Sequence, residues 1–132
     1  MAFTAKHRFA RIAPRKARLI MDLVRGRDVD DAISMLKFAK QRASGMVEKV
    51  IRSAVANANE QETANIRNTL YVARAWVDPG PVIKRFQPKD RGKAYPINKR
   101  TSHLVVTVDE REENEIAPRK SAVGARPGKA RR

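Results

Sequence analysis

Residues 70–77 read Leu-Tyr-Val-Ala-Arg-Ala-Trp-Val and residues 104–109 read Leu-Val-Val-Thr-Val-Asp, and these two stretches decide the fold. In both, the side chains alternate with a period of two, which is typical of a strand with at least one buried face. Residues 5–12 alternate more weakly and predict a short, basic edge strand. The sequence therefore predicts a small sheet rather than an all-helical protein.

The segment between the two clearest strands, about residues 79–103, has no helical pattern and contains four of the chain's seven prolines. A structureless loop of this length is uncommon in a compact domain unless it has a function. We predict a long β-hairpin instead, turning near Lys89–Gly92, because Asp90 and Gly92 are turn residues. Each arm has roughly a dozen residues at ~3.3 Å per residue, so the tip would lie about 40 Å from the base. Such a two-stranded arm is marginally stable until it is bound.

Three helices are predicted before residue 70. Pro14 is expected to begin the first helix, and Gly26 is expected to end it. Asp28 is expected to cap the second helix and Ser44 the third. The polar run 57–68 is expected to end the third helix. The residues expected on the buried side of the first helix are Ala17, Leu19–Met21, Leu23 and Val24. Those of the second helix are Val29, Ala32, Ile33, Leu36 and Phe38, and those of the third are Met46, Val47, Val50, Ile51, Ala54, Val55 and Ala58.

Composition excludes several classes of protein. The chain has 132 residues, of which 29 are Lys or Arg and 14 are Asp or Glu, for a formal net charge of +15. It has no cysteine, which removes disulfide scaffolds, Cys-ligated zinc and thiol catalysis. There is no apolar run long enough to cross a membrane and no secretory signal pattern at residues 1–8, so we expect a cytoplasmic protein. A charge this high predicts a polyanionic partner.

The charge is segregated along the chain. Residues 1–18 carry six basic side chains and no acidic one, residues 79–103 carry seven basic and one acidic, and residues 116–132 carry six basic and none acidic. The last stretch is rich in Pro, Gly and Ala and is expected to be disordered alone. We therefore expect one domain over 1–110 and a basic C-terminal extension over 111–132.

The hairpin has a composition that suits RNA, because its basic residues are interleaved with Ile83, Phe86, Tyr95 and Ile97. Lys and Arg bind phosphates, and a flat ring stacks on an unpaired base. The alternative is a surface arm whose Lys and Pro only protect its edges. Arg15, Lys16 and Arg18 crowd the first turn of a helix, where the dipole disfavours cations but favours phosphates. Surface charge without a role is the alternative there.

The sequence contains no pattern typical of a catalytic site. His103 has no acid-base partner nearby in sequence and is expected to be structural. The Gly92-Lys93 pair lacks the upstream glycine of a phosphate-binding loop. The spacing of Asp109, Glu110, Glu112, Glu113 and Glu115 matches no defined metal site. We expect no enzyme, no cofactor and no metal.

Four stretches carry a resemblance to a known family: Ile12-Ala13-Pro14-Arg15-Lys16-Ala17-Arg18, Ser53-Ala54-Val55-Ala56-Asn57-Ala58, Lys84-Arg85-Phe86-Gln87-Pro88-Lys89-Asp90-Arg91-Gly92-Lys93-Ala94 and Lys99-Arg100-Thr101-Ser102-His103-Leu104. In this order, over about residues 6–110, the chain resembles bacterial large-subunit ribosomal protein twenty-two. The resemblance implies an α+β fold with three helices packed on a small three-stranded antiparallel sheet and a long protruding β-hairpin.

The resemblance also implies a role. Members of that family bind large-subunit rRNA and support early assembly, and their hairpin lines the nascent-peptide exit tunnel. Their partners are rRNA, neighbouring large-subunit proteins including protein four, and the nascent peptide in passing. The resemblance also implies that the protein is a monomer within the ribosome and does not bind a membrane. Hairpin changes linked to macrolide resistance would correspond here to the stretch around Ile83, Lys84 and Arg85.

The predicted site residues fall into three groups. Those expected to bind rRNA are Lys6, Arg8, Arg11, Arg15, Lys16, Arg18, Lys84, Arg85, Lys89, Arg91, Lys93, Lys99 and Arg100. Those expected to stack on bases are Phe86 and Tyr95, and those expected at the tunnel-lining tip are Pro88, Lys89, Asp90, Arg91 and Gly92. Three features depart from the family: Ala13 replaces the usual capping serine, Asp90 is an acid at the tip, and the tail beyond about Arg111 exceeds the usual length.

Two other classes of function share some of these features. An architectural DNA-binding protein also uses β-ribbon arms, ending in a proline wedge, and Pro88 near the tip fits that pattern. Such proteins usually grip DNA as symmetric dimers with paired arms. An enzyme acting on RNA lacks the acid-base pair or metal cluster that it would need.

Overall fold

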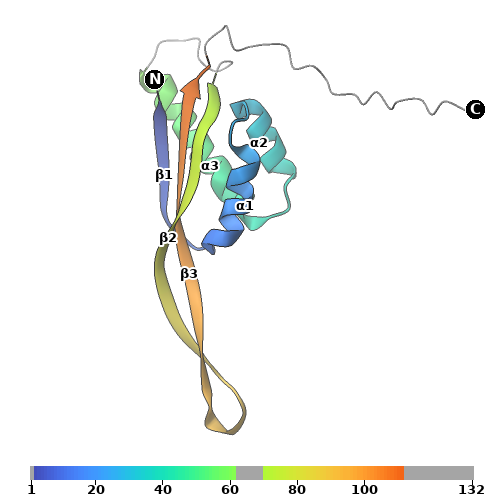
Figure 1. Cartoon of the computed structure of the whole chain (residues 1–132), viewed down its shortest axis with the longest axis vertical. Coiled ribbons are helices and arrows are strands. Elements are labelled where there is room, and N and C mark those ends of the chain that lie inside the picture. The colour runs from blue at the N-terminus through green and yellow to red at the C-terminus, as the bar shows by residue number, and fades with distance from the viewer. Residues whose placement is uncertain (1, 62–69, 112–132) are drawn as a thin grey trace, which may run out of the picture.

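The sheet is built around the last strand of the described residues (Figure 1). The structure, a computed structural model, describes residues 2–61 and 70–111. Its elements in order are β1 (Phe3–Ala10), α1 (Pro14–Val24), α2 (Val29–Phe38), α3 (Arg42–Gln61), β2 (Leu70–Pro88), the short 3-10 turn η2 (Asp90–Gly92) and β3 (Ala94–Glu110). The strands pair antiparallel in the order β1-β3-β2. The predicted α+β class, with three helices and a three-stranded antiparallel sheet, is confirmed.

The core lies between the helices and one face of the sheet. α3 packs on β1 and β3, α1 packs on β2, and α2 packs against α3. On β3 the side chains of Leu104, Val106 and Val108 are fully buried, at every second position as period two requires. Ile51 of α3 and Met21 of α1 are fully buried as well. None of the helices in the described ranges is long and apolar enough to cross a membrane.

A bulge in β2 shifts its alternation. Leu70 and Val72 are buried, but the next buried positions are Ala75 and Val77, because the register with β3 shifts between Val72 and Arg74. One extra residue in a strand reverses which side chains face the core. The sequence pattern identified the strand but not this change of phase.

The end of α1 is joined to β2 beside that bulge. The N–H of Gly26 donates to the carbonyl of Val72 at 2.8 Å, and the N–H of Val72 donates to the carbonyl of Arg27 at 2.9 Å. Gly26 has a φ of 76°, which glycine adopts without a steric penalty. Its prediction as the residue that ends the first helix is confirmed.

The other predicted helix boundaries are confirmed in part. Pro14 opens α1, and Asp28 immediately precedes α2, although its carboxylate accepts a bond from Arg111 Nη1 at 3.1 Å and makes no side-chain capping bond. The prediction that Ser44 caps the third helix is wrong, because α3 begins at Arg42. The Ser44 hydroxyl donates instead to carbonyls before the helix, those of Gln41 and Ala39. The polar run expected to end α3 extends into residues 62–69, which lie outside the described residues.

Three residues predicted to be buried are exposed. Leu19 is 69% exposed and Leu23 47%, because the buried stripe of α1 runs through Ala17, Ile20, Met21 and Val24 and successive helix residues turn by ~100°. Phe38, the last residue of α2, is 88% exposed. The first strand also begins and ends earlier than predicted, at Phe3 and Ala10, since the Ile12 N–H turns back to the Ala10 carbonyl at 2.8 Å.

Beyond the core, β2 and β3 continue together as the lower arm in Figure 1. They stay paired from Val82 with Arg100 to Pro88 with Ala94, after a second register shift between Pro79 and Val82. No residue from Val82 to Arg100 is buried. The turn is closed by the Lys89 N–H, which donates to the Lys93 carbonyl at 2.8 Å. This arm consists of main-chain pairing without a core of its own.

Candidate nucleic-acid interface

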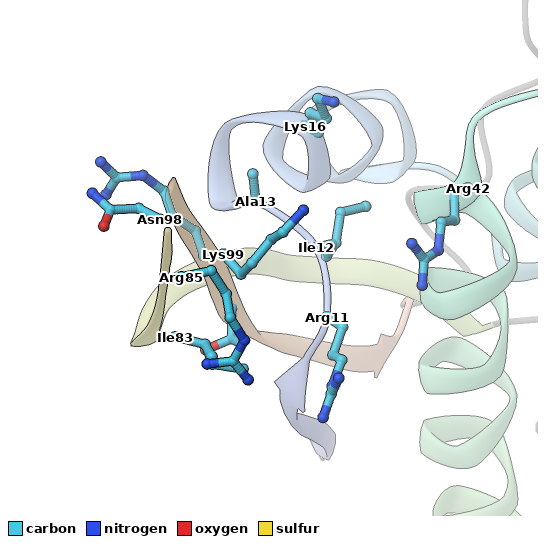
Figure 2. A pocket seen from close by; sticks show the side chains of 11 residues that line it. Arg11, Ile12, Ala13, Lys16, Arg42, Ile83, Arg85, Asn98 and Lys99 are labelled. Atoms are coloured by element: carbon cyan, nitrogen blue, oxygen red, sulfur yellow. The ribbon is translucent and has the colours of Figure 1, made fainter. Parts of the chain in front are cut away.

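A groove forms where the arm leaves the domain, and Figure 2 shows the side chains around it. We call it the basic groove. It has a volume of about 640 Å³, and its lining residues are Arg11, Ile12, Ala13, Lys16, Arg42, Ile83, Arg85, Asn98, Lys99, Arg100 and Thr101. They come from the connection between β1 and α1, the first turns of α1 and α3, and both strands of the hairpin. Four separate parts of the sequence therefore meet in one place.

The groove has an apolar floor and cationic walls. Ile12 is buried, and Ala13 and Ile83 are partly buried. The walls carry six cations, those of Arg11, Lys16, Arg42, Arg85, Lys99 and Arg100, and none of the lining residues is acidic. Cations of this kind bind phosphates, and an apolar floor accommodates sugar and base surface. The lining has the chemistry that a nucleic-acid strand requires.

The local structure makes this concentration of positive charge costly in the free protein. α1 has no side-chain cap at Ala13 and no acidic residue in its first turn, and α3 begins with Arg42 and also has no acidic residue there. Helix N-termini favour anions and disfavour cations. Within the described residues no ion pair involves a groove cation. An anion in the groove would relieve both the mutual repulsion and the cost at the two helix ends.

The groove brings together five of the predicted rRNA-binding residues: Arg11, Lys16, Arg85, Lys99 and Arg100. The others lie elsewhere on the surface. Lys6 and Arg8 are exposed on β1, Arg15 is exposed on α1, Lys84 is exposed on β2, and Lys89, Arg91 and Lys93 are exposed at the tip with Pro88, Asp90 and Gly92. The predicted residues thus lie in the basic groove, on the arm and on the exposed sides of β1 and α1.

Arg18 makes a contact within the fold. Its Nη2 donates to the Val77 carbonyl at 3.4 Å, which ties α1 to β2. On the arm, Phe86 is 73% exposed, whereas the ring of Tyr95 is 47% exposed and has Lys89 Nζ 5.0 Å from its centroid. Both rings are accessible for stacking, and that of Phe86 is the more open.

Sequence reasoning missed Arg42 and Asn98. Arg42 carried a usable signal, since a cation in the first turn of a helix is unfavourable without an anion, the argument already applied to Arg15, Lys16 and Arg18. Asn98 carried no signal, because only the register of the hairpin, in which it pairs with Lys84, places it at the groove.

Catalytic chemistry is not built into this surface. The Nδ1 of His103 accepts a bond from the Phe9 N–H at 2.9 Å, which fits the structural role predicted for it. In the part of the chain that the structure describes, no group of three His, Asp or Glu side chains could hold a metal ion. Of the acidic residues considered earlier, Glu112, Glu113 and Glu115 lie outside that part.

A small α+β domain with a cationic groove and an arm without a core is typical of proteins whose structure is completed by a nucleic acid. Comparison with known proteins is more specific. Residues 5–109 match the family described as Ribosomal protein L22p/L17e. The chain is 50% identical over 109 residues to the large ribosomal subunit protein uL22 of Lacticaseibacillus casei, covering 83% of this chain and 92% of the relative.

Two further relatives carry the same name. That of Bdellovibrio bacteriovorus is 45% identical over 111 residues, covering 84% of this chain and 100% of the relative. That of Lactobacillus delbrueckii subsp. bulgaricus is 54% identical over 106 residues, covering 80% and 90%. The chain belongs to the ribosomal protein L22p/L17e family. It is a structural protein of the large ribosomal subunit and not an enzyme.

Proposed function

We propose that the chain binds large-subunit rRNA through the basic groove and the arm, and that this binding supports early assembly of the subunit. The observation that carries the proposal is the groove itself, where six cations and no acidic side chain surround an apolar floor. Binding releases the counterions held by each neutralised phosphate. Because no residue of the arm from Val82 to Arg100 is buried, the RNA supplies the surface that holds it.

The arm carries the finer part of the proposal. Its exposed tip, Pro88–Gly92, lines the nascent-peptide exit tunnel near large-subunit protein four and meets the nascent peptide in passing. The protein acts as a monomer within the cytoplasmic ribosome. Residues 1–110 act as one domain, and residues 111–132 extend it as a basic tail.

The proposal is tested with the purified full chain. Large-subunit rRNA fragments and duplex DNA compete for binding over a series of salt concentrations. We expect one rRNA fragment to bind tightly in the presence of excess DNA. Each neutralised phosphate should contribute roughly −0.7 to −0.9 to the slope of log affinity against log salt. Equal or tighter binding to DNA would contradict the proposal and favour an architectural DNA-binding protein.

A matched pair of variants on α3 tests the groove. Arg42→Gln removes a cation from the lining, and Arg52→Gln removes a cation from the same helix where it pairs with Glu48 at 2.6 Å, outside the groove. We expect Arg42→Gln to weaken rRNA binding and to reduce the magnitude of the slope of log affinity against log salt by about 1, the loss of one phosphate contact. Arg52→Gln should change neither. Equal effects of the two variants would mean that overall charge matters and the groove does not.

Charge reversal of Lys84 and Arg85 tests the arm. Both side chains are exposed on β2, so their replacement by Glu leaves the core intact. We expect fewer assembled large subunits that contain the variant protein. Normal assembly with the arm in its usual place would show that the arm is not held by its cations.

A further inference from the structure

The edge strand of the sheet contains a distorted residue with an exposed aromatic ring. Phe9 has a φ of 56°, and the register of β1 with β3 shifts between His7 and Ala10. A bulky residue rarely adopts this left-handed conformation, which persists only where surrounding contacts impose it and which is common at functional sites. Bulges at sheet edges often change the direction of a side chain.

His103 on the neighbouring strand holds the distortion in place. Its Nδ1 accepts the Phe9 N–H at 2.9 Å. The two rings also meet edge to face, with centroids 4.9 Å apart and an interplanar angle of 84°. The backbone and the ring of Phe9 are thus both contacted by a single side chain of β3.

The result is a ring presented to solvent beside cations. Phe9 is 55% exposed, whereas Phe3 on the same strand is 4% exposed and belongs to the core. The guanidinium carbon of Arg8 lies over the Phe9 ring, 5.2 Å from its centroid. Arg11 lines the basic groove. It lies two residues after Phe9, so the two Cα atoms are at most about 7.6 Å apart.

We propose that Phe9 is a stacking platform for an unpaired RNA base whose neighbouring phosphates lie in the basic groove, with His103 as its positioning residue. The proposal rests on the RNA-binding function proposed above and adds a contact to a base where the groove offers contacts to phosphates. Aromatic rings stack on any base, so this contact increases affinity without selecting a sequence. The Arg8 guanidinium lies over one face of the ring, so the base stacks on the opposite face, and the bulge turns the ring away from the core.

Two fluorescent probes separate stacking from phosphate binding. One is a ten-nucleotide oligoadenylate, and the other is an abasic ribose-phosphate oligomer of the same length. Phe9→Leu keeps an apolar side chain but removes the flat ring. We expect this variant to bind the oligoadenylate between about fivefold and about 140-fold more weakly, the range for losing one stacked ring. It should bind the abasic oligomer as the wild type does. The salt slope should not change, because no charge is lost.

Further variants distinguish the loss of stacking from a defect in folding. Phe9→Tyr should keep the affinity for oligoadenylate, and Phe9→Gly, which tolerates the positive φ, should lose it as Phe9→Leu does. Phe38→Leu is the matched control, since Phe38 is an exposed phenylalanine at 88% that does not line the groove. It should bind both probes normally. In the Phe9→Leu background, His103→Gln should have no further effect on binding of oligoadenylate, as expected if His103 acts through Phe9.

The outcomes are distinct. If Phe9→Leu binds oligoadenylate as the wild type does, or loses affinity equally for both probes, the stacking proposal is overturned while RNA binding by the groove stands. If the wild-type chain binds neither probe in a salt-dependent way, the proposed function itself fails.

Discussion

Ser102 is a polar residue in the interior of the sheet. It is fully buried opposite Ala10, and its hydroxyl has no hydrogen-bond partner among the described residues. Removing an unpaired buried hydroxyl relieves its desolvation cost. We therefore expect Ser102→Ala to raise the free energy of unfolding by up to about 1 kcal/mol, measured by urea denaturation.

The neighbouring hydroxyl provides the control for Ser102. Thr101 is also buried, but its Oγ1 donates to the Pro81 carbonyl at 2.6 Å. The nearly isosteric Thr101→Val should lower the free energy of unfolding by about 1 kcal/mol because that bond is lost. Destabilisation by Ser102→Ala of similar size would mean that the Ser102 hydroxyl is also bonded.

Gly80 is required by a close approach between the two strands at the base of the arm. A Cβ at this position would lie 2.5 Å from Thr101 Oγ1 and 3.2 Å from the Thr101 carbonyl carbon. Thr101 is held by its bond to Pro81, so it cannot move aside freely. We expect Gly80→Ala to cost about 1–3 kcal/mol of stability, as overpacking does. Thermal unfolding measures the change, and an unaffected midpoint would show that the strands separate easily here.

At the scale of single elements, α3 contains a glycine with the opposite expectation. Gly45 is exposed in the first turns of α3, and a Cβ there would meet nothing within 4 Å. Gly45→Ala should therefore stabilise the protein by about 0.5–1 kcal/mol, because alanine loses less backbone entropy in a helix. Gly45→Ala is therefore the matched control for Gly80→Ala, and thermal unfolding measures both variants. A loss of stability would indicate that Gly45 faces a contact outside the described residues.

The arm should be the least protected element of the free protein. Its strands pair along their main chains but bury no side chain between Val82 and Arg100. Amides of this segment should exchange with deuterium much faster than those of Ala75, Leu104 and Val106 in the core. Adding the cognate rRNA fragment should slow exchange in the arm. Equal protection of arm and core without RNA would contradict the view that the RNA stabilises the arm.

The elements differ in how far local sequence could predict them. Pro14 and Gly26 mark the ends of α1 because their own backbone preferences suit those positions. The start of α3 was missed because Ser44 makes its hydrogen bonds to the preceding turn, an alternative that its sequence does not distinguish from a cap. The bulge at Ala73 was missed because period two continues to fit the residues on each side of it.

The groove was predictable only in part for a related reason. Arg11 and Arg85 are both predicted to bind RNA, but nothing in the local sequence indicates that they line the same groove. Their meeting depends on the register of the hairpin and on the position of α3, which brings in Arg42. Composition predicts a polyanionic partner, whereas tertiary packing determines which cations line one groove.

At the scale of the whole molecule, the free protein should be stabilised by salt. Its formal net charge is +15, and the groove concentrates cations at short range. Raising ionic strength shortens the Debye length from about 30 Å at 0.01 M to about 10 Å at 0.1 M, which screens this repulsion. We expect the thermal midpoint to rise with added sodium chloride, and to rise less in the Arg11→Gln/Arg42→Gln variant. A midpoint that falls with salt would show that attractive ion pairs dominate.

The strand order also determines when the protein can fold during its own synthesis. β1 and β2 each pair with β3, the last of the three to be made. At about 5–20 residues per second, roughly one to five seconds separate completion of residue 77 from completion of residue 104. Throughout that interval the apolar faces of two strands have no partner, which is the condition under which nascent chains aggregate or bind chaperones. A chain interrupted before residue 104 would lack the sheet on which its helices pack.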